Sequence, residues 1–198
     1  VTGVQTCALP ICSHFRGPGG LPLPLHADGV HVGMTEASLV ANCNYALTPY
    51  NKENGALTIV PGSHRKNRQP TPNENWMHGD ATVTDVVGQQ LPAEELDQLE
   101  WTPPPGITTF EIDPGDAVIW HGNTWHGGWR REAPGCRMNL AAYFCRPHLS
   151  TQERRGDDRY PEVFEKYADE PLFAQLMGEK GYNGWRDEGP RSEEHTSE

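Results

Sequence analysis

The sequence has few basic residues relative to acidic ones. Lysine and arginine together number 16, against 27 aspartates and glutamates, which gives a formal net charge of −11. The longest local basic run is only RKNR, at residues 65–68. Proteins that bind nucleic acid or anionic membrane surfaces usually present a basic patch to the phosphates. The composition therefore argues against nucleic-acid and membrane partners.

Long apolar runs and paired cysteines are also missing. A membrane-spanning helix needs about 20 consecutive apolar residues, and no stretch approaches that length. Outside the first 11 residues the cysteines are Cys12, Cys43, Cys136 and Cys145, with no CxxC or metal-ligand spacing. We interpret them as small buried residues in a reducing compartment rather than as disulfide partners. The prediction is a cytoplasmic protein.

The two ends of the chain resemble translated sequencing-adapter sequence. They are residues 1–11, VTGVQTCALPI, and residues 191–198, RSEEHTSE, and neither has the charged start and apolar core of a signal peptide. We therefore exclude both as artefacts and expect one domain over residues 12–190, which suits its length. We also expect that this domain is partial and N-terminally truncated.

Turn residues and alternating patterns predict a series of short strands. The sequence has 18 prolines and 21 glycines, and runs of period two lie between them, as in strands joined by turns. Strands are expected at 39–48, 56–60, 107–112, 116–120 and 137–144, with a hairpin turn at Asn54-Gly55. Apolar residues at helical spacing over 157–178 predict a late amphipathic helix. This order is typical of an all-β sandwich or barrel with a C-terminal helix.

The strand at 39–48 has one apolar face and one face with short amides. The apolar positions 39, 41, 43, 45 and 47 alternate with a face that includes Asn42 and Asn44. Such amides either line a wet cavity or meet bulk solvent, and the pattern leaves both open.

The segment over residues 65–106 is long, polar and interrupted by prolines. A short helix is expected within it, at 93–99. Long connections are uncommon in compact domains and are often lids or binding loops, which is our interpretation of this one.

Two stretches far apart in the sequence can together supply metal ligands. His26 and Asp28 stand two residues apart in HADG, and side chains at i and i+2 of an extended chain point to the same side. The later stretch GDAVIWHGNTWHGG contains His121 and His126, and both qualify by position as a second histidine. Two histidines and one carboxylate suit non-haem Fe(II), because three coordination positions stay open for other groups.

Arg137 follows these histidines and supplies a fixed cation. An oxoacid that chelates iron through one carboxylate and its keto oxygen leaves its far carboxylate in need of a cation. Arginine can meet that carboxylate through two parallel hydrogen bonds. A hairpin through residues 132–135 would place Arg137 on the strand beside His126.

The order HAD, then ENGAL and VPGSH, then GDAVIWHGNTWHGG and an arginine, resembles the phytanoyl-CoA dioxygenase family of Fe(II)/2-oxoglutarate-dependent oxygenases. The resemblance covers about residues 23–147. It implies a double-stranded β-helix (a jelly roll, cupin-like) with Fe(II), 2-oxoglutarate and O₂. In that family the distal ligand is the histidine of the second HG, and the 2-oxoglutarate arginine follows eleven residues later. These positions are His126 and Arg137, so the implied metal ligands are His26, Asp28 and His126.

The resemblance also implies a reaction. Family members hydroxylate a small organic substrate while 2-oxoglutarate is decarboxylated to succinate and CO₂. Asp28 favours hydroxylation, because related halogenating enzymes have a small residue at that position. Asn44 lies where some members carry an aromatic residue near 2-oxoglutarate, so it is a candidate contact together with Arg137. The resemblance identifies neither the substrate nor the oligomeric state.

A second class of function stays open. A cupin-like domain could use the same ligands for zinc or manganese without redox chemistry, as a metal-binding module or an isomerase. Addition of Fe(II) and 2-oxoglutarate without oxygen separates the two, because the oxygenase predicts a weak visible charge-transfer band. Absence of that band, with tight zinc binding, would favour the second class.

Overall fold

The computed structural model describes residues 7–16, 19–33, 35, 37–146, 148–149, 161–170 and 172–177. The chain divides into two compact units, one made of Val1–Ile11 and Ala142–Glu198 and the other of Cys12–Ala141. All the predicted site residues belong to the second unit. The adapter-like tail at 191–198 lies outside the described residues, and the expected domain limits stay predictions. No helix in the described part is long and apolar enough to cross a membrane.

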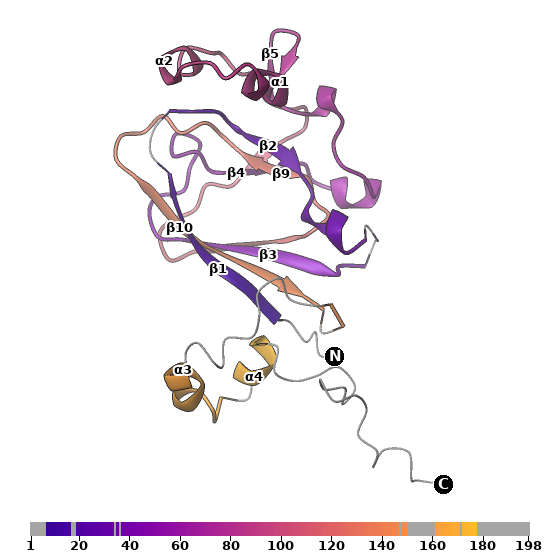
Figure 1. The fold of residues 1–198 in the computed structure, drawn as a ribbon, viewed down its shortest axis with the longest axis vertical. Helices are drawn as coiled ribbons and strands as arrows, with labels where there is room; N and C mark the ends of the chain where they lie inside the picture. The colour runs from indigo at the N-terminus through magenta and orange to yellow at the C-terminus, as the bar shows by residue number, and fades with distance from the viewer. Residues whose placement is uncertain are drawn as a thin grey trace. The chain divides into compact units, whose positions relative to one another are not determined.

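Two four-stranded sheets make up the core, in agreement with the predicted all-β class. The first has the order β1 (Cys7–Arg16), β10 (Arg137–Cys145), β3 (Val40–Ala46) and β8 (Ala117–His121). The second has the order β2 (Leu23–His26), β9 (His126–Gly128), β4 (Leu57–Ile59) and β7 (Thr108–Thr109). Within the second unit, β2, β4 and β9 form a layer above β3 (Figure 1).

Short elements complete the described chain. A small sheet pairs β5 (Met77–His78) with β6 (Ala81–Thr82), and α1 (Val83–Gly88) and α2 (Ala93–Leu96) follow it. These elements lie beyond the β2–β9 layer in Figure 1. Three 3-10 turns are η1 (Asp28–His31), η2 (Ser63–Lys66) and η3 (Pro72–Glu74), and the late helices are α3 (Pro161–Lys166) and α4 (Phe173–Leu176).

The core lies between the two sheets and follows from strand alternation. Side chains on successive residues of a strand point to opposite faces. On β8, Val118 and Trp120 are therefore buried, while Ile119 between them is 71% exposed. They pack in a cluster with Ala46, Tyr50, Ala56 and Leu57. Apolar burial of this kind is the main favourable contribution to folding.

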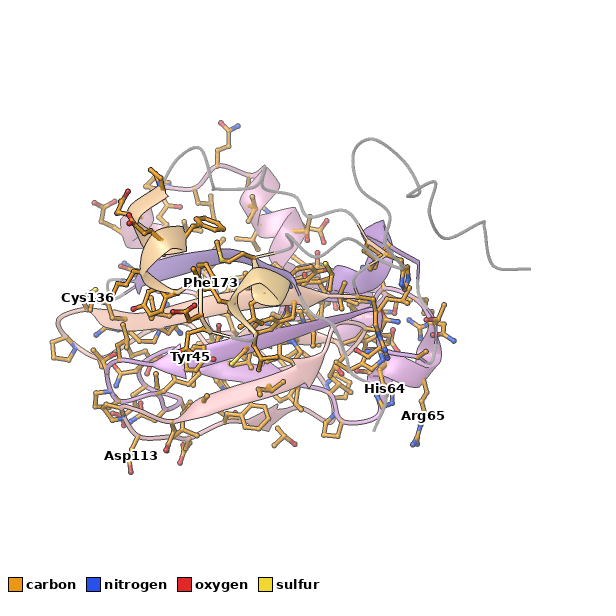
Figure 2. All side chains as sticks on the ribbon, turned by 90° about the horizontal axis from the view of Figure 1, so that it is seen from below. Tyr45, His64, Arg65, Asp113, Cys136 and Phe173 are labelled. Carbon is orange, nitrogen blue, oxygen red and sulfur yellow. The ribbon has the colours of Figure 1, made fainter. Side chains whose placement is uncertain are left out.

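The amide face of β3 points into the protein. Asn42 is buried and Asn44 is half-buried, whereas Tyr45 and Leu47 on the apolar face are exposed; Figure 2 labels Tyr45 on this strand. Of the two interpretations that the sequence left open, the structure therefore supports amides that line the interior. A buried amide needs hydrogen-bond partners, and those of Asn42 and Asn44 lead to the site.

The two predicted hairpins are wrong. β3 lies between β10 and β8, while β4 lies between β9 and β7, so the turn at Asn54-Gly55 carries the chain from one sheet to the other. Gly55 has a φ of +71°, and a Cβ there would meet the Trp129 carbonyl oxygen at 2.9 Å. Likewise, Arg137 starts β10 in the first sheet and is not on a strand beside His126, which starts β9 in the second.

The helices differ from prediction in number and length. The helix expected at 93–99 ends at Leu96, and α1 was not predicted, although Thr82 and Asp85 form a capping box at its start. In place of one late helix the structure has α3 and α4, whose Phe164 and Phe173 rings lie 5.2 Å apart. Packing of this tail on a sheet stays a prediction.

The cysteine prediction is confirmed in part. Cys43 and Cys136 are free thiols, and Cys43 and Cys145 are buried. Cys136 is exposed, contrary to prediction, because it lies in the loop before β10 (Figure 2). The side chain of Cys12 lies outside the described part.

Candidate metal centre

The structure brings together the three residues that the sequence singled out as metal ligands. His26 ends β2, His126 starts β9, and the two are opposite each other in antiparallel pairing. Their ring centroids lie 4.3 Å apart. Asp28 follows at the start of η1, with Oδ1 at 3.5 Å from His26 Nε2 and Oδ2 at 3.4 Å from His126 Nε2. The ligand atoms of the three residues all lie within 4.8 Å of one another.

Backbone carbonyls fix the orientation of both imidazoles. Nδ1 of His26 lies 2.9 Å from the Pro24 carbonyl oxygen, and Nδ1 of His126 lies 2.9 Å from that of Thr124. A carbonyl oxygen only accepts hydrogen bonds, so each Nδ1 carries the proton and donates it. Each Nε2 is therefore the ring nitrogen left to bind a metal, and both Nε2 atoms face Asp28. A hydrogen bond from the non-ligating nitrogen is usual for histidines that bind metals.

Two further hydrogen bonds hold Asp28, one to its carboxylate and one from its backbone. Asn42 Nδ2 donates a hydrogen bond of 2.7 Å to Asp28 Oδ2, and the Asp28 amide donates to the Gly122 carbonyl at 2.9 Å. Burial raises the pKa of Asp28, but hydrogen bonding and charge from His126, with smaller contributions from His26 and Asn42, leave that pKa below its ordinary value. The carboxylate is therefore ionised at neutral pH and ready to bind a cation.

The imidazole of His26 is held in the form that a metal requires. Burial, followed by the charge of His126, lowers the pKa of His26. A neutral imidazole is the metal-binding form, because a bound proton occupies the ligand nitrogen. The side chains of His26 and Asp28 are 40% and 31% exposed, whereas that of His126 is 6% exposed. Solvent thus reaches the group from the side of His26 and Asp28.

Arg137 is a buried cation without a described counter-ion. Its Nη1 donates to the Gly55 carbonyl, and its guanidinium lies 5.1 Å from the centre of the Tyr50 ring. Its Nε is buried without a hydrogen-bond partner, and none of the ion pairs within the described ranges involves it. Burial lowers the pKa of Arg137, yet a guanidinium stays charged at neutral pH. A buried charge in this state favours an anionic ligand.

Inward-facing residues connect the carboxylate to the arginine. Asn44 stands two residues after Asn42 on the same face of β3, which separates them by about 7 Å. Asn44 Nδ2 lies 3.4 Å from the Tyr50 hydroxyl, and the Tyr50 ring contacts Arg137. Sequence reasoning named Asn44 but missed Asn42 and Tyr50. The inward amide pattern of the strand was the available signal for Asn42; Tyr50 gave none.

His121 stays outside the group of convergent ligands. In the described part of the chain that group consists of His26, Asp28 and His126. Nδ1 of His121 instead accepts a hydrogen bond of 3.0 Å from the Asn123 amide, and its ring lies 5.1 Å from that of His64. Between the two histidines that the spacing allowed, the geometry thus favours His126.

The two tryptophans that flank His126 lie in different surroundings. Trp125 is buried, and its Nε1 donates to the Arg68 carbonyl at 2.7 Å. Trp129 Nε1 donates to Thr109 Oγ1, and Thr109 pairs with Thr58 rather than with Ile59, the partner of His126. Alternation therefore places Trp129 on the opposite face of the sheet from His126. There Trp129 lines a hollow of about 440 Å³ with Trp76 and Trp101. Neither Trp125 nor Trp129 is therefore placed at the metal ligands.

Comparisons with known proteins identify the family of this chain. The model of the family described as Phytanoyl-CoA dioxygenase (PhyH) matches residues 6–138. Dioxygenase andF of Emericella variicolor is 30% identical over 173 residues, 84% of this chain and 49% of that protein. Ectoine dioxygenase of Bordetella parapertussis is 32% identical over 106 residues, 50% of this chain and 32% of that protein. This chain thus spans about half or less of the length of these relatives.

A solved structure shows the same fold at low identity. It is HygX from Streptomyces hygroscopicus with nickel and 2-oxoglutarate bound, which is 17% identical to this chain. The TM-score is 0.51, and the match covers 77% of this chain and 60% of that one. Identity at this level supports the arrangement of the strands and no finer statement.

Proposed function

Because this chain belongs to the phytanoyl-CoA dioxygenase family, we propose that it is an Fe(II)- and 2-oxoglutarate-dependent oxygenase that hydroxylates a small organic molecule. Relatives named as dioxygenases support this class of reaction. The observation that carries the proposal is the convergence of His26, Asp28 and His126, whose ligand atoms lie within 4.8 Å of one another. Two imidazoles and one carboxylate are the ligand set of non-haem Fe(II) oxygenases.

The chemistry of the donor set fits the ion. His26 and His126 present Nε2, because each Nδ1 is hydrogen-bonded to a carbonyl, and Asp28 presents a carboxylate that Asn42 orients. When bound, the iron supplies the oxygen chemistry that couples decarboxylation of 2-oxoglutarate to succinate and CO₂ with hydroxylation of the substrate. The protein's part is to hold the ligands, orient both substrates and limit access of water.

Arg137 would bind the far carboxylate of 2-oxoglutarate. It is buried and charged, and its Nε has no partner. Arginine is the residue that meets a carboxylate through parallel hydrogen bonds. Asn44 is a further candidate contact, since it bonds to Tyr50 beside the Arg137 guanidinium. The carboxylate would then form a buried ion pair with the Arg137 guanidinium, for which the described residues supply no counter-ion.

Succinate formation tests the proposal. The chain is incubated with Fe(II), 2-oxoglutarate and oxygen, and succinate is measured with each member of a small-molecule library. We expect succinate above the level of the His126→Ala variant, with further stimulation by compounds that are hydroxylated. Succinate no higher than in His126→Ala, together with tight zinc binding, would contradict the proposal and favour a non-redox metal-binding or isomerase domain.

We also propose that the two sheets are the layers of a jelly roll and that the protein is cytoplasmic. The likeness to HygX supports the first statement. The free thiols of Cys43 and Cys136 support the second, because free thiols persist in reducing compartments.

A further inference from the structure

The strand that carries the first metal ligand lies at the edge of its sheet. In the order β2-β9-β4-β7, β2 has β9 on one side, and the described strands provide no neighbour on the other. An edge strand presents backbone N–H and C=O groups that need partners. The side-chain amides of Gln69 and Asn75, in the segment that follows β4, supply those partners.

Each amide pairs with both backbone groups of one residue. Gln69 Oε1 accepts from the Ala27 amide at 2.9 Å, and Gln69 Nε2 donates to the Ala27 carbonyl at 2.6 Å. Asn75 Oδ1 accepts from the Leu25 amide at 2.9 Å, and Asn75 Nδ2 donates to the Leu25 carbonyl at 3.1 Å. A side-chain amide offers the same acceptor and donor as a peptide group, so the two side chains replace a neighbouring strand.

The same segment also fixes the chain beside the second histidine. Ser63 Oγ accepts from the Trp125 amide at 2.8 Å, and Trp125 Nε1 donates to the Arg68 carbonyl at 2.7 Å. The Lys66 ammonium lies 4.1 Å from the centre of the Trp125 ring, within the range of a cation–π contact. Because Trp125 directly precedes His126, residues 63–75 hold the backbone next to both histidines.

We propose that Gln69 is a positioning residue for the metal centre. Ala27 is the single residue between His26 and Asp28, so the bonds from Gln69 fix the spacing of these two ligands. Ala27 is only 2% exposed, which means that its N–H and C=O could not turn to bulk water if Gln69 were lost. Unsatisfied buried groups favour rearrangement of the backbone, and here that rearrangement would move Asp28 relative to His26. The inference rests on the proposed function of this site.

Cobalt titration of the Gln69→Met variant tests this role. Methionine keeps the length of glutamine but removes the donor and the acceptor. We expect Gln69→Met to weaken Co(II) binding about tenfold or more, as loss of residues that support metal ligands commonly does, and to change the visible Co(II) spectrum. Hydrogen exchange of the Ala27 amide in the metal-free chain should become faster. Gln98 is an exposed glutamine just after α2. Gln98→Met should leave the Co(II) affinity, the Co(II) spectrum and the hydrogen exchange of the Ala27 amide unchanged.

The outcomes separate this inference from the proposed function. Wild-type Co(II) affinity and spectrum in Gln69→Met would overturn the inference, as would equal losses in Gln69→Met and Gln98→Met. If the unaltered chain binds no Co(II), the proposed metal site itself fails and the inference with it. Should Gln69→Met unfold, Gln69→Asn, which shortens the side chain by one methylene, gives the same comparison against the unaltered chain.

Discussion

Asn42 donates to the carboxylate of Asp28 from the inward face of β3. We predict that Asn42→Ala raises the pKa of Asp28, because the hydrogen bond favours the ionised form. The variant should also bind Co(II) about tenfold more weakly, since residues that orient metal ligands commonly contribute that much. A Co(II) titration at pH 7 checks the change in affinity. Asn44→Ala, two residues along the same strand, is the control and should keep the affinity of the unaltered chain; equal affinities in all three proteins would contradict the prediction.

Arg137 is predicted to set the affinity for 2-oxoglutarate. Truncation of one partner of a buried ion pair typically costs at least about 2 kcal/mol, so Arg137→Ala should raise the Kd for 2-oxoglutarate about thirtyfold or more. Calorimetric titration of the Co(II)-loaded protein gives this constant, and the Co(II) affinity should be retained. Arg65→Ala removes an exposed arginine (Figure 2) and should change neither constant. An unaltered 2-oxoglutarate Kd in Arg137→Ala would mean that another group binds the far carboxylate of 2-oxoglutarate.

At the residue scale, the sequence named the candidate ligands but not the residues that support them. His26 and Asp28 follow from their spacing, and the choice of His126 needed the resemblance as well. Asn42 belongs to a visible row of amides, yet its bond to Asp28 depends on how β3 meets the chain after β2. Gln69 gives no signal at all, because its partner Ala27 lies 42 residues away. Such contacts are set by tertiary packing and have no local pattern.

The pairing of β2 with β9 brings His26 opposite His126, and Gly127 makes this close approach possible. A Cβ on Gly127 would meet the Leu23 carbonyl oxygen at 2.5 Å and that of Pro24 at 3.1 Å. These are backbone atoms of β2, so the strands would have to separate. Gly127→Ala is therefore predicted to destabilise the fold by about 1–3 kcal/mol, as overpacking does, and to weaken Co(II) binding.

The control for this prediction is Gly88→Ala in α1. A Cβ there has no atom within 4 Å, and alanine is favoured over glycine in helical backbone. Urea unfolding should therefore show equal or slightly higher stability for Gly88→Ala and lower stability for Gly127→Ala. Equal stability of the two variants would mean that β2 and β9 tolerate a side chain between them.

At the element scale, strands were predicted better than their pairing. The expected strand at 39–48 matches β3, and that at 137–144 matches β10 to within a residue. Alternation shows which residues share a face, and glycine or asparagine shows where the chain turns. Neither shows which sheet the next strand joins, so the hairpins at Asn54-Gly55 and at 132–135 were wrong. The first part of the segment predicted as a lid instead supports both ligand strands; a lid role for the rest stays a prediction.

At the scale of the whole molecule, the site is assembled from both sheets. The second sheet supplies His26 and His126, while the first supplies Asn42 on β3 and Arg137 on β10. The metal set and the cation therefore come together only when the sheets pack face to face. The family resemblance named more of the candidate site than any local pattern did, because it carries information about the arrangement of distant segments.

Anaerobic addition of Fe(II) and 2-oxoglutarate to the chain is the decisive test of the ligand assignment. We predict a weak visible charge-transfer band that requires both additions, is lost in His126→Ala and is retained in His121→Ala. The Arg137→Ala variant should show the band only at higher 2-oxoglutarate concentration. No band in the unaltered chain, or a band that survives His126→Ala and disappears in His121→Ala, would contradict the assignment of His26, Asp28 and His126 as the iron ligands.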